Sequence, residues 1–371
     1  MKVIIAAAGT GGHINPGIAI ADIIEKENPG SDIRFIATGK KLEEDLIHNA
    51  GYKSYAIEAY GFSKKISIDN IKKTIKTIKG FSQAKKILKE FKPDIVIGTG
   101  GYICGAVISS AHSLKIPTLL HESNAYPGLA IRLLSRKVDT ILVGIENAKN
   151  DIKGAKRVVY TGTPTKVKPL NLSLKDKKNI LKKTNINNDK KVVLVVGGSQ
   201  GAKKINDCIL DIIINKKNVN YNLIWATGKG QYDSIKEELS NNKMNIEKLD
   251  NASILPFIYN MDEMLSVSDL VIARSGALTL TELALMGKPA IFIPLPSCSS
   301  NRQEDNARVF EKNNAAKIIL NNEVNGDNLN EMINSLVEDD NLLKDMSKAS
   351  NKMAVYNVEE RIYNEIKRLV G

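Results

Sequence analysis

The chain begins with MKVIIAAAGTGGHINPGIAIADII, residues 1–24, and this stretch decides the fold. Residues 3–8 are apolar and predict a buried strand, the glycines after them predict a turn, and the apolar residues after Pro16 predict a helix. Strand, glycine-rich turn and helix in this order form the first part of a parallel α/β unit. Backbone amides at the start of such a helix can hold an anion or let a sugar approach closely.

The glycines of this turn do not match the common nucleotide-binding patterns. A full G-x-G-x-x-G is absent, and Asp32 precedes the second predicted strand instead of ending it, so a nicotinamide site is weakly supported. No G-K-S or G-K-T follows the glycines, which excludes a P-loop.

His13 follows Gly12 at the mouth of the turn. Histidine titrates near neutrality, so the side chain is a natural general base. A histidine that only hydrogen-bonds a backbone carbonyl explains the local sequence equally well.

Apolar segments alternate with helical segments along the whole chain, and the opening design restarts with KKVVLVVGGSQGAKKINDCILDIII from Lys190. The fold class is therefore predicted as α/β with two Rossmann-like domains in tandem. Pro164 and Pro169 mark a linker, so we assign residues 1–161 to one domain and 162–371 to the other. Ligands bind beyond the carboxyl ends of parallel strands, which predicts an active site in the cleft between the domains.

Composition is that of a globular protein, with 43% hydrophobic and 25% charged residues in 371. Three scattered cysteines suggest neither a disulfide framework nor a metal cluster, and the apolar N-terminal segment is too short for a signal peptide. A cytoplasmic protein is expected. Residues 95–114 contain no charged side chain, but their glycines favour a buried strand-turn-helix over a membrane span.

The net charge is +12, and lysine is densest from Lys64 to Lys92, where isoleucines are interleaved. A basic amphipathic stretch of this kind can bind an anionic membrane, although a solvated helix face explains it too. Without aromatic platforms or arginine clusters, a nucleic-acid partner is not expected.

Further polar clusters follow the predicted strands. GTGGY (98–102) and HESNAYPG (121–128) belong to the first domain, where His121 and Glu122 form either a catalytic pair or a structural link. GGSQGA (197–202) and RSGALTLTE (274–282) start helices of the second domain and suit a diphosphate. Glu282 could accept hydrogen bonds from ribose hydroxyls or simply face solvent. NRQEDNA (301–307) supplies amides and carboxylates that can bind sugar hydroxyls.

Metal chemistry has no clear sequence support. No D-x-D triplet occurs, and no His, Cys and Glu cluster has metal spacing, so neither a metal nor a cofactor is expected. Helix amides and cationic side chains would meet the charge of a leaving group.

The opening glycine turn and these five clusters, in this order, resemble the MurG family of UDP-N-acetylglucosamine transferases. The resemblance covers nearly the whole chain. It implies a GT-B fold, with the acceptor undecaprenyl-diphospho-N-acetylmuramoyl-pentapeptide on the N-terminal domain and UDP-N-acetylglucosamine mainly on the C-terminal domain. It also implies a peripheral enzyme on the cytoplasmic face of the cell membrane, whose last helix can pack back on the N-terminal domain.

Site residues follow from the resemblance. His13 would take the proton from the acceptor 4-hydroxyl, Ile258 would contact uracil through its backbone, Glu282 would hold the ribose and Gln303 the N-acetylglucosamine. Tyr102, His121 and Glu122 match the acceptor side of the cleft, and Glu122 stays an alternative base. The donor-site residues are Thr10, Gly11, Gly12, Asn124, Lys166, Ser199, Ile258, Ala277, Leu278, Thr279, Leu280, Thr281, Glu282 and Gln303.

The chain departs from the family at two places. Lys166 stands where the family usually has arginine, so the charge is kept but the planar fork that binds two oxygens is lost. Cys104 and Ala106 replace a serine and a proline, a change expected to affect packing more than chemistry.

The expected reaction is a direct, inverting glycosyl transfer without a covalent intermediate. Another GT-B enzyme, such as a glycolipid transferase or a UDP-N-acetylglucosamine 2-epimerase, is the nearest alternative. A non-catalytic nucleotide-binding protein could use the same twin Rossmann frame, because fold does not fix function.

Overall fold

The computed structural model describes residues 1–59, 68–186, 189–198, 200–249, 251–296 and 302–371, and for residues 68–78 it describes the backbone only. The chain forms two compact units. The first contains Met1–Lys166 and Val355–Gly371, and the second contains Val167–Ala354. The sequence put the division between residues 161 and 162, and the family resemblance implied that the last helix can pack back on the N-terminal domain; the last 17 residues belong to the first unit.

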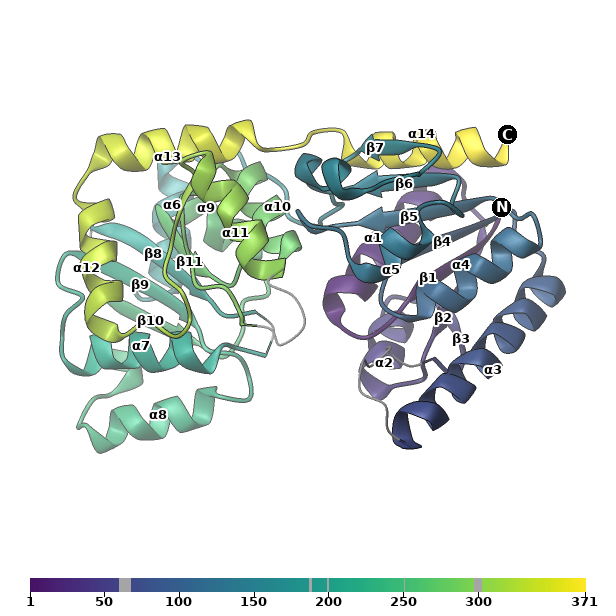
Figure 1. Cartoon of the computed structure of the whole chain (residues 1–371). Helices are drawn as coiled ribbons and strands as arrows, with labels where there is room; N and C mark the ends of the chain where they lie inside the picture. Colours follow the sequence, from purple (N-terminus) through teal and green to yellow (C-terminus); the bar gives the residue numbers. More distant parts are fainter. Residues whose placement is uncertain (60–67, 187–188, 199, 250, 297–301) are drawn as a thin grey trace. The chain divides into compact units, whose positions relative to one another are not determined.

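Unit 1 is built on a seven-stranded parallel sheet in the order β3-β2-β1-β4-β5-β6-β7 (Figure 1). Its strands are β1 (Lys2–Ala7), β2 (Asp32–Ala37), β3 (Lys53–Ala56), β4 (Ile95–Gly100), β5 (Thr118–Glu122), β6 (Thr140–Val143) and β7 (Val158–Tyr160). Its helices are α1 (Gly11–Glu27), α2 (Lys41–Asn49), α3 (Ile68–Phe91), α4 (Ile103–Ser113), α5 (Leu129–Leu134) and α14 (Val358–Val370), and a 3-10 helix spans Glu146–Asp151.

Both faces of this sheet are covered. Along β1, Val3 and Ile5 pack with apolar residues of α1 and α14, whereas Ile4 and Ala6 pack on the opposite face with residues of α3 and α4. All four side chains are 0% exposed. Continuous apolar strands are typical of parallel sheets with helices on both sides, which is why residues 3–8 contain no polar residue.

The C-terminal helix α14 is fixed to unit 1 by charged contacts. Glu365, whose side chain is only 9% exposed, accepts hydrogen bonds from Arg157 (2.9 and 2.6 Å) and from Arg368 (2.9 Å). The hydrogen bonds from Arg157 lower the pKa of the Glu365 carboxyl. Ile362 and Ile366 of the same helix are fully buried beside α1.

Unit 2 is built on a six-stranded parallel sheet in the order β10-β9-β8-β11-β12-β13. Its strands are β8 (Lys191–Val196), β9 (Tyr221–Ala226), β10 (Ala252–Leu255), β11 (Leu270–Ala273), β12 (Ala290–Phe292) and β13 (Ala316–Ile318). Its helices are α6 (Leu174–Lys183), α7 (Lys203–Ile214), α8 (Tyr232–Asn241), α9 (Met261–Val267), α10 (Ala277–Met286), α11 (Arg302–Lys312), α12 (Gly326–Val337) and α13 (Asp340–Lys352), and a 3-10 helix spans Ile246–Lys248.

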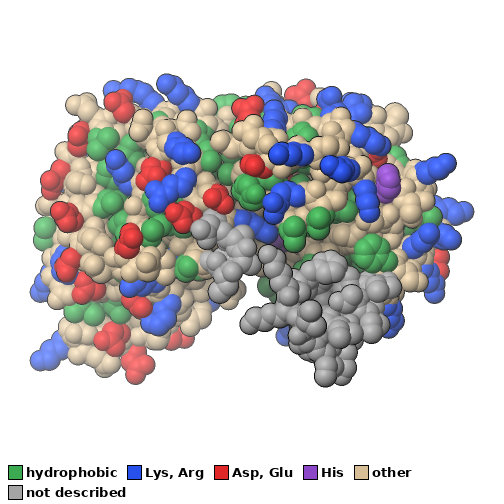
Figure 2. Space-filling view, viewed as in Figure 1, with side chains coloured by type: hydrophobic (Ala, Val, Ile, Leu, Met, Phe, Trp, Pro, Cys, Tyr) green, Lys and Arg blue, Asp and Glu red, His purple; other side chains and the backbone are tan. Residues whose placement is uncertain are grey.

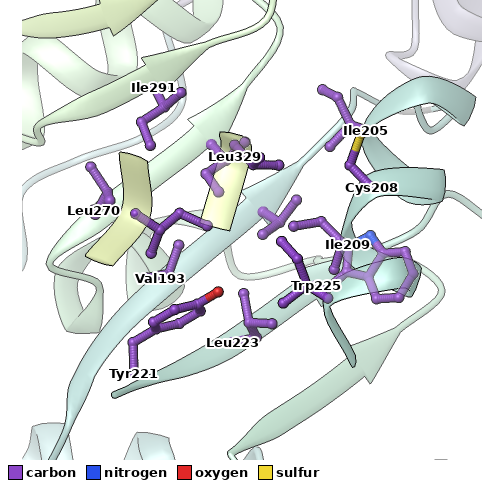
Figure 3. Packing of buried hydrophobic residues seen from close by; sticks show 14 of the residues in the cluster. Val193, Ile205, Cys208, Ile209, Tyr221, Leu223, Trp225, Leu270, Ile291 and Leu329 are labelled. Carbon is purple, nitrogen blue, oxygen red and sulfur yellow. The ribbon is translucent and has the colours of Figure 1, made fainter. Parts of the chain in front are cut away.

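The core of unit 2 lies between this sheet and helices that include α7 and α12. Figure 3 shows Trp225 of β9 beside Ile209 and Cys208 of α7. The buried indole Nε1 donates a 3.0 Å hydrogen bond to Asn206 Oδ1, and Asn206 Nδ2 donates to the carbonyl of Thr227 at 2.8 Å. A buried amide with its hydrogen-bonding groups paired costs little and fixes the position of the chain after β9.

The fold confirms the predicted α/β class and the two parallel-sheet domains. Residues 95–114 form β4 and α4, as predicted. Within the described part of the chain, none of the helices has the length and apolar character needed to cross a bilayer.

Candidate active site

Unit 2 has a pocket of about 620 Å³ at the carboxyl ends of its central strands. Its walls come from the segments that follow β8, β10, β11 and β12, together with residues of α10 and α11. β8 and β11 are neighbours in the sheet, and the strand order reverses between them. Ligands of open parallel sheets bind at such a switch point, so the topology itself places the pocket.

The pocket brings together four residues that the sequence predicts for the donor: Ile258, Thr279, Glu282 and Gln303. The first turn of α10 also faces it. Gly276 is the N-cap of this helix, no side chain caps it and its first turn holds no acidic residue. The amides of this turn and the positive end of the helix dipole are therefore suited to an anion.

The other α10 residues predicted for the donor do not line the pocket. Leu280 is 1% exposed and belongs to the core, and Thr281 Oγ1 donates to the carbonyl of Ala277 at 3.1 Å. Ala277 and Leu278 lie in the first turn, where a backbone amide can act without its side chain. Ser199 lies outside the described residues.

Gln303 is oriented by two contacts. Its side-chain oxygen accepts a 2.9 Å hydrogen bond from the amide of Leu295, and its backbone carbonyl accepts one of 2.6 Å from Ser275 Oγ. Because the oxygen is engaged by a backbone N–H, the amino group of the side chain is the part that can donate to a ligand. The fixed amide therefore offers a ligand a hydrogen-bond donor.

The sequence analysis gave Arg274 no role, although it lines the same pocket. Its Nη1 donates to the carbonyls of Ile293 and Pro294 at 2.8 and 3.1 Å and to Asn321 Oδ1 at 2.8 Å. Its Nε is buried and has no hydrogen-bond partner among the residues that the structure describes, and burial lowers the pKa of the guanidinium. A buried cation with an unpaired donor favours an anion nearby. The feature of the sequence that could have pointed to Arg274 is its position directly after the apolar strand β11.

In unit 1 the turn after β1 and the turn after β4 interlock. A Cβ atom on Gly100 would lie 2.2 Å from His13 Nδ1, so the imidazole lies directly against this glycine. Thr99 is the extra residue where the register between β1 and β4 shifts, and its Oγ1 donates to the His13 carbonyl at 2.7 Å. The structure therefore brings His13 to the β1/β4 switch point of its sheet.

Thr10, Gly11 and Gly12 lie in the same turn as His13, and Tyr102 is the N-cap of α4. Two helices thus begin beside each other at neighbouring strand ends, α1 after β1 and α4 after β4.

His121 and Glu122 form two separate sets of structural contacts. His121 is buried and its Nε2 lies 3.1 Å from the carbonyl oxygen of Gly162; burial lowers its pKa. Glu122 accepts hydrogen bonds from the amide and side chain of Asn124, both 2.9 Å, and from the amide of Gly128 at 2.7 Å. Both carboxylate oxygens of Glu122 are thus engaged in holding residues 123–128.

Lys166 belongs to unit 1, where its Nζ lies 3.5 Å from Asp22 Oδ2, and it does not line the pocket of unit 2. Cys104 is buried beside the carbonyls of Ala6 and Gly100, and burial raises the pKa of its thiol to about 12. Across the residues that the structure describes, His, Cys, Asp and Glu form no group of three that could hold a metal ion.

Two Rossmann-like parallel-sheet domains, one with a pocket at the switch point of its sheet, form the GT-B type of fold, which the crystal structure of a MurG protein shares. The profile of the glycosyltransferase family 28 N-terminal domain matches residues 3–143, and that of the family 28 C-terminal domain matches residues 192–362. The chain belongs to glycosyltransferase family 28 and, within it, to the MurG family.

Individual relatives support this assignment over the full length of the chain. A UDP-N-acetylglucosamine–N-acetylmuramyl-(pentapeptide) pyrophosphoryl-undecaprenol N-acetylglucosamine transferase from Ruminiclostridium cellulolyticum is 43% identical over 370 residues, which covers 100% of both chains. The transferase of the same name from Acetivibrio thermocellus is 40% identical and covers 100% of this chain and 98% of its own. The crystal structure of Acinetobacter baumannii MurG is 28% identical, with a TM-score of 0.77 over 99% of this chain and 100% of that one.

Proposed function

We propose that the protein transfers N-acetylglucosamine from UDP-N-acetylglucosamine to the 4-hydroxyl of the muramoyl sugar in undecaprenyl-diphospho-N-acetylmuramoyl-pentapeptide. It is thus a hexosyltransferase of peptidoglycan biosynthesis. The observation that most supports this function is the pocket of unit 2, where Ile258, Thr279, Glu282 and Gln303 meet in a chain that matches the named transferases from end to end. The test is whether label in the sugar of UDP-N-acetylglucosamine is transferred to a lipid-linked muramoyl-pentapeptide acceptor.

The donor is proposed to bind unit 2. The α10 amides and Arg274 would meet the diphosphate, whose negative charge grows as the bond to the sugar breaks. Gln303 would donate a hydrogen bond to the sugar through its amino group, since Leu295 occupies its oxygen. Ser199, which lies outside the described residues, and Lys166, which does not line this pocket, stay proposals based on the family resemblance.

The acceptor is proposed to bind unit 1, where His13 takes the proton from the attacking hydroxyl. Oxygen attacks the anomeric carbon as UDP leaves from the opposite face, so the configuration inverts and no covalent enzyme intermediate forms. His13 is favoured over Glu122 as the base because both Glu122 oxygens already accept hydrogen bonds from their own loop. Tyr102, Asn124 and residues 10–12 are proposed to contact the bound sugars.

Replacement of Glu282 by alanine is expected to weaken UDP binding about 10- to 100-fold, because hydrogen bonds from the ribose to a charged carboxylate are worth about 1.5–3 kcal/mol. For 2′,3′-dideoxy-UDP, which lacks the ribose hydroxyls, the variant and the unchanged protein should have the same affinity. Titration calorimetry with both nucleotides measures the difference. Glu331→Ala, an exposed glutamate of α12, is the control. Equal losses for UDP and its dideoxy analogue would show that Glu282 does not bind the ribose.

A peripheral position on the cytoplasmic face of the membrane is also proposed. The residues of unit 1 include 28 Lys and Arg against 18 Asp and Glu, whereas unit 2 has 25 against 23, so most of the excess positive charge belongs to unit 1. Figure 2 shows Lys and Arg side chains over the visible face of unit 1. The lysine-rich stretch 64–92 lies partly outside the described residues, and of residues 68–78 only the backbone is described.

Helix α5 of unit 1 adds exposed apolar side chains to this charge. Leu129 and Leu133 are 53% and 64% exposed, and the Arg132 guanidinium lies 5.3 Å from the centre of the Tyr126 ring. Apolar residues beside cations can insert at the headgroup level of an anionic bilayer.

The double variant Leu129→Ser/Leu133→Ser is expected to bind anionic vesicles about tenfold more weakly, because burying each leucine contributes about 1.5–3 kcal/mol when complete. Co-sedimentation with phosphatidylglycerol vesicles measures this. Leu174→Ser, at an 81% exposed position of α6 in unit 2, is the matched control. Undiminished binding of the double variant, or binding indifferent to salt and anionic lipid, would contradict the proposal.

A further inference from the structure

Unit 1 contains a fully buried carboxylate that the mechanism above does not use. Glu43, in the first turn of α2, is 0% exposed. Within the described part of the chain it forms no ion pair, and its hydrogen bonds come from neutral groups. Burying an ion without a counter-ion is costly unless its oxygens are well hydrogen-bonded. A carboxylate at this position therefore needs an explanation beyond packing.

The contacts of Glu43 join two loops at the carboxyl edge of the sheet. Oε1 accepts a 2.8 Å hydrogen bond from the amide of Gly9, in the turn after β1. Oε2 accepts hydrogen bonds from the amide and hydroxyl of Thr38, at 2.8 and 2.7 Å, just after β2. One side chain thus fixes the glycine turn to the end of the neighbouring strand.

The turn fixed in this way leads directly to His13. Gly9 has a φ of +102°, a conformation that glycine adopts readily. Four residues later the amide of His13 donates to the Thr10 carbonyl at 3.0 Å in the first turn of α1. Two of the three intervening residues are glycines, whose backbone is conformationally permissive, so the Gly9 contact helps to restrain the end of the turn nearer to β1. Thr99 and Gly100 restrain His13 from the other side.

We propose that Glu43 is a positioning residue for the transfer reaction: its buried carboxylate holds the Gly9 end of the turn so that the His13 imidazole stays aligned for proton abstraction. This inference rests on the proposed role of His13 as the base. A misplacement of about 1 Å can lower a rate about 100-fold, so the contact matters to the rate without touching substrate.

The test is a double-mutant cycle between positions 43 and 13. Glutamine at position 43 keeps one acceptor oxygen but turns an amino group toward the other backbone donor, which breaks one of the two anchors. Glu43→Gln should lower kcat about 10- to 100-fold, with UDP affinity, measured on unit 2, unchanged within about twofold. In a His13→Ala background the same change should lower the remaining activity less than about threefold, because that protein has no histidine for Glu43 to position.

Glu44→Gln is the matched control, since it is the same change on the next residue of α2, at an exposed position. It should leave kcat unchanged. If Glu43→Gln fails to fold by circular dichroism, Glu43→Asp enters the same cycle, because the shorter side chain keeps the charge but cannot span both loops.

Equal losses in the two backgrounds would overturn the inference, because they would mean that Glu43 only stabilises the fold. So would a kcat within twofold of the unchanged protein. If the unchanged protein transfers no sugar, the proposed function itself is refuted. This outcome is distinct from failure of the Glu43 inference, because the kcat ratios of the cycle are all measured relative to the activity of the unchanged protein.

Discussion

Replacing His13 by alanine is expected to lower kcat for sugar transfer about 10²- to 10⁴-fold, the usual contribution of a general base. The acceptor hydroxyl is a poor nucleophile unless its proton is removed as it attacks. His13 is placed for this by the turn after β1, by Thr99 and by contact with Gly100. The UDP pocket is built entirely from residues of unit 2, so UDP affinity should stay within about twofold.

Single-turnover kinetics with labelled donor measures this loss separately from product release. His112→Ala, which removes an exposed histidine at the end of α4, is the control and should leave kcat unchanged. A kcat for His13→Ala within about threefold of the unchanged protein would remove His13 from the mechanism. Glu122 would then be the next candidate for the general base, although both of its carboxylate oxygens accept hydrogen bonds from its own loop.

Replacing Gly100 by alanine is expected to lower kcat by a similar factor, at least about 100-fold. The new Cβ would lie 2.2 Å from His13 Nδ1, inside any allowed contact, so the imidazole must leave its place. Gly100 also has a φ of +123°, which adds backbone strain of about 1–3 kcal/mol for alanine. The imidazole is the group that must yield, because Gly100 is fixed within β4.

A substitution at a second glycine separates the effect of backbone strain from the effect of displacing the His13 imidazole. Gly51 has a φ of +86° and no atom within 4 Å of the position of a Cβ, so Gly51→Ala has the strain without the clash. It should lower the melting temperature but not kcat. If Gly100→Ala keeps its activity, or if its loss persists in full in the His13→Ala background, the contact between the two residues is not what the reaction needs.

Much of the fold could be predicted from the sequence because the central strands are fully apolar. Segments such as residues 3–8 and 192–195 are buried on both faces, and each is followed by glycines and a helix. The strands at the sheet edges are short and give a weaker signal in the sequence. β3, β7 and β13 lie at sheet edges, where Lys53, Val158 and Lys317 are exposed or half-buried, so the apolar signal fades.

The chain path at the C-terminus could not be predicted from local sequence. Val355 to Gly371 returns to unit 1 because Ile362 and Ile366 find a partner in α1 and Glu365 finds Arg157, contacts between residues roughly 200 or more positions apart. Amphipathic periodicity shows that a helix needs an apolar partner, but not which one.

The candidate sites were predicted where strand ends and glycine turns mark them, as at residues 9–13 and 274–282. No role was predicted for Glu43, nor for the side chain of Arg274 at the start of the second of these segments. A glutamate in a helix and an arginine after a strand look solvent-exposed in sequence, and only tertiary structure shows that Glu43 is 0% exposed and that Arg274 Nε is buried. Burial of a charge is a property of the fold, not of the segment.

The most direct test of the proposed function follows the fate of labelled sugar. The protein is mixed with UDP-N-acetylglucosamine labelled in the sugar and a short-chain analogue of undecaprenyl-diphospho-N-acetylmuramoyl-pentapeptide, with and without EDTA, and with the acceptor omitted in parallel. The expected result is label in the lipid and an equal amount of UDP, only when acceptor is present and regardless of EDTA. UDP release without labelled lipid would indicate an epimerase or another acceptor, and tight UDP binding without turnover would indicate a nucleotide-binding protein; either result would contradict the proposed transfer.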